Sequence, residues 1–129
     1  MPQILVLEPY PALRQALTVL LQRAGWYVTT ASTARTTVQA LAQDSYDVLV
    51  VDLDNTGGEG WCVLHALQWR PARLAVVALL SPDSRQWPDA QAHETPVLVP
   101  TPVRREALLM AVRVALTSAR DRPGGAQAP

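Results

Sequence analysis

Short apolar runs alternate with segments of helical periodicity along nearly the whole chain. The runs are Ile4 to Leu7, Val28 with Trp26 and Tyr27, Val48 to Val51, Leu74 to Leu80 and Val97 to Val99. Strands that helices cover on both faces read as continuous apolar stretches, and regular alternation of strands with helices is the pattern of a parallel α/β sheet. Five alternations therefore predict five parallel strands joined by helical crossovers.

The helical segments differ in how clearly the sequence marks their ends. The apolar stripe of the first helix ends at Gly25, and either Ser32 or Thr33 is suited to cap the second helix. Residues 82–96 hold three prolines and little apolar periodicity, so we expect a short or irregular fourth helix that starts at about Pro88. The last helix is predicted from about Val103 to Thr117.

Composition limits the classes of protein to which the chain can belong. The 129 residues suit one domain, predicted over 1–117, with 118–129 as a disordered tail or linker. With 49% hydrophobic residues and eleven positive charges against eleven negative, the chain resembles neither a disordered protein nor a polybasic nucleic-acid binder. All eleven positive charges are arginine, which excludes any chemistry that needs a lysine amine.

Cysteine and apolar segments add two further exclusions. Cys62 is the single cysteine and cannot close an intrachain disulfide, and together with His65 and His93 it does not make a paired-cysteine metal site. No segment approaches the roughly 18 apolar residues that span a bilayer, and the first residues lack the features of a signal peptide. We expect a cytoplasmic domain without membrane or nucleic-acid contacts.

Polar side chains follow four of the predicted strands at the same edge of the sheet. Glu8 ends the first strand, Asp52 the third and Ser81 the fourth, and Thr101 follows the fifth. Because the carboxyl ends of parallel strands converge where ligands bind in open α/β sheets, this edge is the predicted functional site.

Each of these residues also has a purely structural interpretation. Asp52 and Ser81 are residue types that start turns, Glu8 is either a solvated loop acid or a weak metal ligand, and Thr101 is either a linker residue or a site residue. Cys62 and His65 lie three residues apart in one helix, which packing explains as well as ligation does.

The chain resembles the receiver domain of bacterial two-component response regulators over residues 3–117. The resemblance rests on ILVLE ending the first strand, on Arg14, on YDVLVVDLDNTGGEG around the third strand and on VLVPTP before the last helix. It implies a flavodoxin-like, doubly wound five-stranded sheet in the order 2-1-3-4-5. It also implies that Asp52 is the position that accepts a phosphoryl group from a histidine kinase, with Gly60 eight residues later opening the next helix.

The sequence departs from that family at several functional positions. Glu8 is followed by Pro9, where the family has a second acid that binds Mg²⁺, and Thr101 precedes Pro102, where the family has a lysine. The family's Thr or Ser after the fourth strand matches Ser81, although Leu80 fits the spacing about as well. The resemblance also implies a cis peptide bond between Thr101 and Pro102.

These departures remove cationic groups that phosphoryl transfer requires. Loss of one stabilising donor costs about 3 to 4 kcal/mol in a transition state, so the loss of a lysine and a metal ligand slows transfer by orders of magnitude. Glu8 and Asp52 would form a weak Mg²⁺ site at best.

The sequence therefore predicts a degenerate receiver, a pseudo-receiver in phosphorelay signalling, that acts without phosphorylation as a protein-interaction module and not as an enzyme. The alternative is a competent receiver that is phosphorylated on Asp52. A third interpretation, a flavodoxin-fold enzyme or nucleotide binder, lacks a glycine-rich phosphate loop after the first strand. The predicted partner is a histidine kinase or another signalling protein.

Apolar residues surround most of the last helix. We expect a core stripe at Ala107, Met110, Ala111 and Val114. The remaining apolar residues suggest either a wide core face or a homodimer interface, the latter formed by Leu108, Leu109, Val112 and Leu116.

Overall fold

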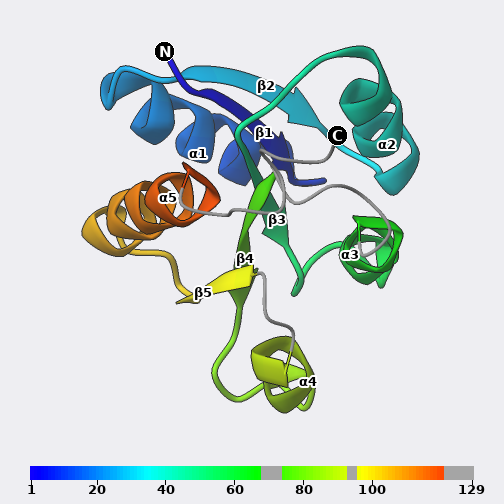
Figure 1. Cartoon of the computed structure of the whole chain (residues 1–129). Coiled ribbons are helices and arrows are strands. Elements are labelled where there is room, and N and C mark those ends of the chain that lie inside the picture. The colour runs from blue at the N-terminus through cyan, green and yellow to red at the C-terminus, as the bar shows by residue number, and fades with distance from the viewer. Residues whose placement is uncertain (68–73, 93–95, 121–129) are drawn as a thin grey trace.

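A computed structural model describes residues 1–67, 74–92 and 96–120 (Figure 1). The strands are β1 (Gln3–Leu7), β2 (Tyr27–Ala31), β3 (Val48–Asp52), β4 (Ala75–Leu80) and β5 (Pro96–Pro100). The helices are α1 (Pro11–Arg23), α2 (Ala34–Gln43), α3 (Glu59–Leu67), α4 (Trp87–Ala92) and α5 (Arg105–Arg120). All strand pairs are parallel and the order is β2-β1-β3-β4-β5, which confirms the predicted flavodoxin-like, doubly wound fold.

Alternate strand residues build two separate cores. Ile4 and Val6 of β1 face the side of the sheet that α1 and α5 cover, and Leu5 and Leu7 face the side of α2, α3 and α4. Figure 1 shows α1 and α5 together on one side of the sheet and α2 with α3 on the other. Every residue of β3 and β4 is buried, which explains their continuous apolar sequence.

Local signals place the helix ends. Thr33 is the cap of α2: its hydroxyl accepts from the Thr36 amide at 3.1 Å, and the Thr36 hydroxyl accepts from the Thr33 amide at 3.2 Å. The chain leaves α1 through Gly25 at a φ of +94°, a conformation that favours glycine. The short fourth helix is present, with Pro88 as its second residue. The Thr101–Pro102 peptide bond is cis.

Two predicted boundaries are wrong. The second strand runs from Tyr27 to Ala31 instead of centring on Val28, because β2 is an edge strand whose polar Thr29 and Thr30 remain exposed while pairing with β1. The last helix continues to Arg120, beyond the predicted end at Thr117. The rest of the predicted tail, residues 121–129, lies outside the described residues, as do Trp69 and His93.

The prediction for α5 is correct in part, since Ala111 is buried and Ala107 packs against the core as expected. Leu108 and Val112 are fully buried, and Leu109 and Leu116 are partly buried against the same core. This agrees with the wide core face, and Leu108 and Val112 are not open to a second chain. Met110 and Val114, predicted as core, are instead 59% and 45% exposed. A helix with apolar residues around most of its circumference does not itself reveal which stripe the sheet will bury. None of the helices in the described ranges is long and apolar enough to cross a membrane.

Candidate functional site

Asp52 is the last residue of β3 and is 1% exposed. Its Oδ1 accepts hydrogen bonds from the backbone amides of Asp54, at 2.9 Å, and Asn55, at 3.2 Å. Its Oδ2 accepts from the Nδ2 amide of the Asn55 side chain at 2.8 Å. Both oxygens therefore accept hydrogen bonds from the loop after β3, as the side chain of an aspartate does when it stabilises a turn.

Glu8 lies directly after β1 and is fully buried, so it is not a solvated loop acid. Its Oε2 accepts from the Tyr10 amide at 3.2 Å, whereas its Oε1 has no hydrogen-bond partner. Burial, followed by a hydrogen bond to the Asp52 side chain, raises the pKa of Glu8 from 4.5 to about 8. Glu8 therefore holds its proton at neutral pH, beside Asp52.

Arg14 is the arginine that approaches this pair of acids. Its guanidinium Nη1 donates to the backbone carbonyls of Glu8, at 3.1 Å, and Pro9, at 3.3 Å. In the part of the chain that the structure describes, no arginine is hydrogen-bonded to the side chain of Glu8 or Asp52. Arg14 thus ties the loop after β1 to α1 and leaves the Asp52 carboxylate without a cationic partner there.

Asp54 connects the ends of three strands. Its Oδ1 accepts from the Ser81 amide at 3.0 Å and its Oδ2 accepts from the Thr101 hydroxyl at 2.8 Å. The Ser81 hydroxyl accepts from the Asp83 amide at 3.3 Å, which is the geometry of a turn. The structure thus gathers the residues predicted at this edge into two neighbouring groups, Glu8 with Asp52 and Ser81 with Thr101, and Asp54 joins them.

Gly60 is fixed by close packing against the end of β3. A Cβ atom there would lie 2.9 Å from Leu53 Cδ2, 2.9 Å from Thr56 Oγ1 and 3.1 Å from the Asp52 carbonyl oxygen. The buried Thr56 hydroxyl accepts from the Gly60 amide at 3.0 Å. The glycine therefore lets the start of α3 approach the strand that positions Asp52.

The donor set is a poor fit to Mg²⁺, the ion that the resemblance implies. Glu8 and Asp52 lie together, but both Asp52 oxygens already accept N–H groups, and of the four carboxyl oxygens only Glu8 Oε1 has no hydrogen-bond partner. No group of three His, Cys, Asp or Glu side chains suited to a metal occurs among residues 1–67, 74–92 and 96–120. Mg²⁺ prefers octahedral oxygen ligation, which this arrangement does not supply.

The contacts of two acids in this region do not follow from the sequence pattern. Asp54 accepts from Ser81 and Thr101, which lie 27 and 47 residues further along the chain. Glu59 begins α3, and its Oε1 accepts from the Ala34 amide of α2 at 2.8 Å. The position of Asp54 at the carboxyl edge, two residues after Asp52, was the signal that could have identified it.

The known proteins that resemble this chain do so in three dimensions. No family model matches the sequence, and no curated protein is detectably similar to it. The chemotaxis response regulator CheY4 of Vibrio cholerae is 21% identical with a TM-score of 0.79, and the match covers 90% of this chain and 99% of that one. The signal receiver domain of a histidine kinase from Syntrophus aciditrophicus is 17% identical with a TM-score of 0.82, covering 95% of each chain.

A third structure carries ligands. The response regulator TrrA from Thermotoga maritima, in complex with Mg²⁺ and BeF, is 22% identical with a TM-score of 0.75, and the match covers 90% of this chain and all 100% of that one. At these identities the comparisons establish the fold, which is that of receiver domains.

Proposed function

We propose that this chain is a degenerate receiver domain that serves two-component signalling as a phosphorylation-independent interaction module. The observation that supports this most directly is the state of Asp52, whose two oxygens accept three N–H groups while the side chain is 1% exposed. A carboxylate in that state is a poor nucleophile, because attack on a phosphoryl donor requires one oxygen to be released and exposed.

The contacts of Thr101 support the same proposal. Phosphoryl transfer depends on cations that neutralise the transferred oxygens. The residue at the place of the family's lysine is Thr101, whose hydroxyl donates to Asp54 and not to Asp52. Thr101 is uncharged and its hydroxyl is directed to Asp54, so it supplies no cation to a phosphoryl group on Asp52.

The test is incubation with acetyl phosphate and Mg²⁺, followed by intact-protein mass spectrometry. We expect no mass increase of one phosphoryl group in the wild-type chain, and none in Asp52→Asn. Beryllofluoride, followed by ¹⁹F NMR, is expected to give no bound signal. A mass increase that requires Mg²⁺ and is lost in Asp52→Asn would overturn the proposal.

The second candidate function is a phosphorylation-competent receiver. One observation favours it: Oε1 of Glu8 is buried beside Asp52 and has no hydrogen-bond partner, so it could ligate a cation. TrrA, which shares the fold, was captured with Mg²⁺ and BeF. In this case the chain accepts a phosphoryl group on Asp52 from a histidine kinase, and the same experiment distinguishes the two functions.

A further inference from the structure

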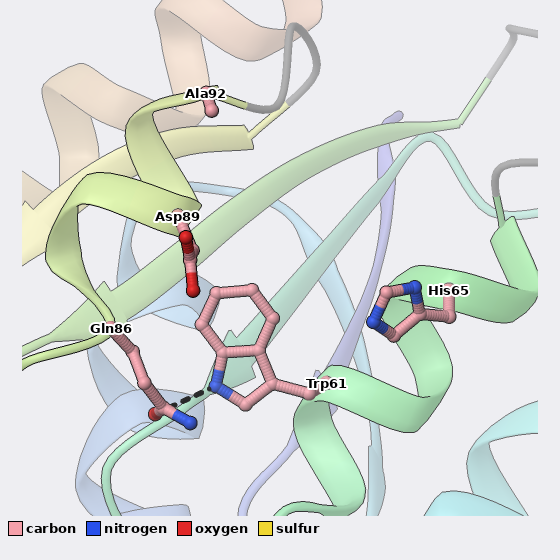
Figure 2. Close-up of a pocket in the computed structure, with 5 residues that line it drawn as sticks. All are labelled: Trp61, His65, Gln86, Asp89 and Ala92. Atoms are coloured by element: carbon pink, nitrogen blue, oxygen red, sulfur yellow. Dashed lines mark hydrogen bonds between the residues drawn. The ribbon is translucent and has the colours of Figure 1, made fainter.

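A pocket of about 410 Å³ lies between α3 and α4. Its lining residues are Trp61, His65, Gln86, Asp89 and Ala92. Trp61 and His65 lie one helical turn apart on α3, while Gln86, Asp89 and Ala92 repeat at intervals of three along α4 and the residue before it. Figure 2 shows the indole of Trp61 between the residues of the α4 side and His65.

The indole is held in a defined position. Its Nε1 donates to the Gln86 Oε1 at 2.9 Å, which joins the two walls of the pocket. The Asp89 carboxylate points from α4 toward the six-membered ring of Trp61 (Figure 2). An electron-rich ring and a carboxylate therefore converge on the same space, and both attract a positive charge.

The lining excludes other ligand classes. A phosphate or nucleotide would meet the Asp89 carboxylate, and none of the lining residues that the structure describes is an arginine. A purely apolar ligand would desolvate Asp89 and Gln86 without replacing their hydrogen bonds. Asp89 is the carboxylate among the described lining residues.

We infer that this pocket binds an arginine side chain of a partner protein, with the guanidinium stacked on Trp61 and paired with Asp89. A planar guanidinium can stack on an aromatic face and hydrogen-bond a carboxylate at once, which an ammonium group cannot do equally well. The volume lies near the lower end of the range for ligand pockets, roughly 300 to 1,000 Å³, and suits one long side chain. The inference goes beyond the proposed function, and neither outcome of its test depends on phosphorylation of Asp52.

The test is a titration of the ¹⁵N-labelled chain with N-acetyl-arginine amide, followed through the indole N–H signals. The signal that disappears in Trp61→Phe identifies Trp61. We expect a saturable shift of this signal, and binding of the neutral isostere N-acetyl-citrulline amide that is about three- to tenfold weaker, given the modest strength of exposed cation–π and ion-pair contacts.

Matched variants locate the binding site. Asp89→Asn is expected to weaken arginine binding about three- to tenfold and to remove the preference over citrulline. Asp83→Asn removes an exposed carboxylate that does not line the pocket and is expected to leave the affinity unchanged. The inference is wrong if no saturable shift of Trp61 occurs, if citrulline binds equally well, or if Asp83→Asn weakens binding as much as Asp89→Asn.

Discussion

The Thr101 hydroxyl donates a hydrogen bond to Oδ2 of Asp54 at 2.8 Å, across 47 residues of sequence. The other oxygen of Asp54 accepts from the Ser81 amide, so one carboxylate connects the loop after β3 to the ends of β4 and β5. The acid next but one to Asp52, and not Asp52 itself, thus organises the carboxyl edge of this sheet.

The Asp54–Thr101 contact makes a stability prediction. Asp54→Ala and Thr101→Val should each lower the free energy of unfolding, by about 1 to 2 kcal/mol, because the hydrogen bonds involve a charged acceptor at a partly exposed site. The double variant should lose less than the sum, with a coupling of about 0.5 to 1.5 kcal/mol in urea denaturation. Asp83→Ala, an exposed acid nearby, is the control and should change stability by less than about 0.5 kcal/mol. Strict additivity would mean that the contact contributes nothing.

The buried Glu8 predicts a pH dependence of stability. Its pKa is raised from 4.5 to about 8, so between these values the folded chain holds a proton that the unfolded chain has released. The associated stability is fully present below about pH 4.5 and is lost as the pH rises through about 8, with a total of about 3 to 5 kcal/mol.

The isosteric variant Glu8→Gln isolates this effect. Glutamine cannot ionise, so the unfolding free energy of this variant should change much less between pH 5 and pH 9 than that of the wild type. At pH 9 the variant should be the more stable of the two chains. Glu106→Gln changes an exposed glutamate at the start of α5 and should retain the wild-type profile. A wild-type stability that does not fall between pH 5 and pH 9 would contradict the buried, protonated state of Glu8.

Gly60 is expected to be the least replaceable glycine in the described part of the chain. Gly60→Ala places a methyl group 2.9 Å from Leu53 and Thr56 side-chain atoms and should cost about 1 to 3 kcal/mol through overpacking. Gly57→Ala meets no atom within 4 Å but keeps a φ of +60°, so about 1 kcal/mol of backbone strain is expected. Thermal unfolding of both variants checks the order, and an equal or larger loss for Gly57→Ala would show that the packing at Gly60 is relaxed.

The two faces of α5 should respond differently to truncation. Leu108→Ala removes a fully buried side chain and should lower the free energy of unfolding by about 2 to 5 kcal/mol. Met110→Ala, at a residue that is 59% exposed, should stay within about 0.5 kcal/mol.

The same pair of positions separates folding from association. Met110→Glu should fold normally, and light scattering of this variant against the wild type reports whether the exposed face of α5 binds a second copy of the chain.

Similar destabilisation by Leu108→Ala and Met110→Ala would mean that α5 is rotated about its axis relative to the structure.

Much of the site could be predicted from the sequence because the end of a strand is a local feature of the chain. The runs that end at Glu8 and Asp52 are apolar throughout, and a parallel sheet brings their carboxyl ends to one edge whatever the details of packing. The role of Asp54 could not be read in the same way. Its partners are 27 and 47 residues distant, and a loop acid has many donors within reach until the neighbouring strands are placed.

The sequence by itself determined the five-stranded parallel sheet, the short fourth helix and the edge at which the acids and hydroxyls meet, because apolar periodicity and helix signals act over a few residues. Only the tertiary structure decided that Glu8 is buried and protonated beside Asp52, that Thr101 binds Asp54, and that α5 buries Leu108 and exposes Met110. These outcomes depend on which surfaces of distant segments come into contact. Local spacing does not encode that choice, since desolvation and packing are properties of the assembled core.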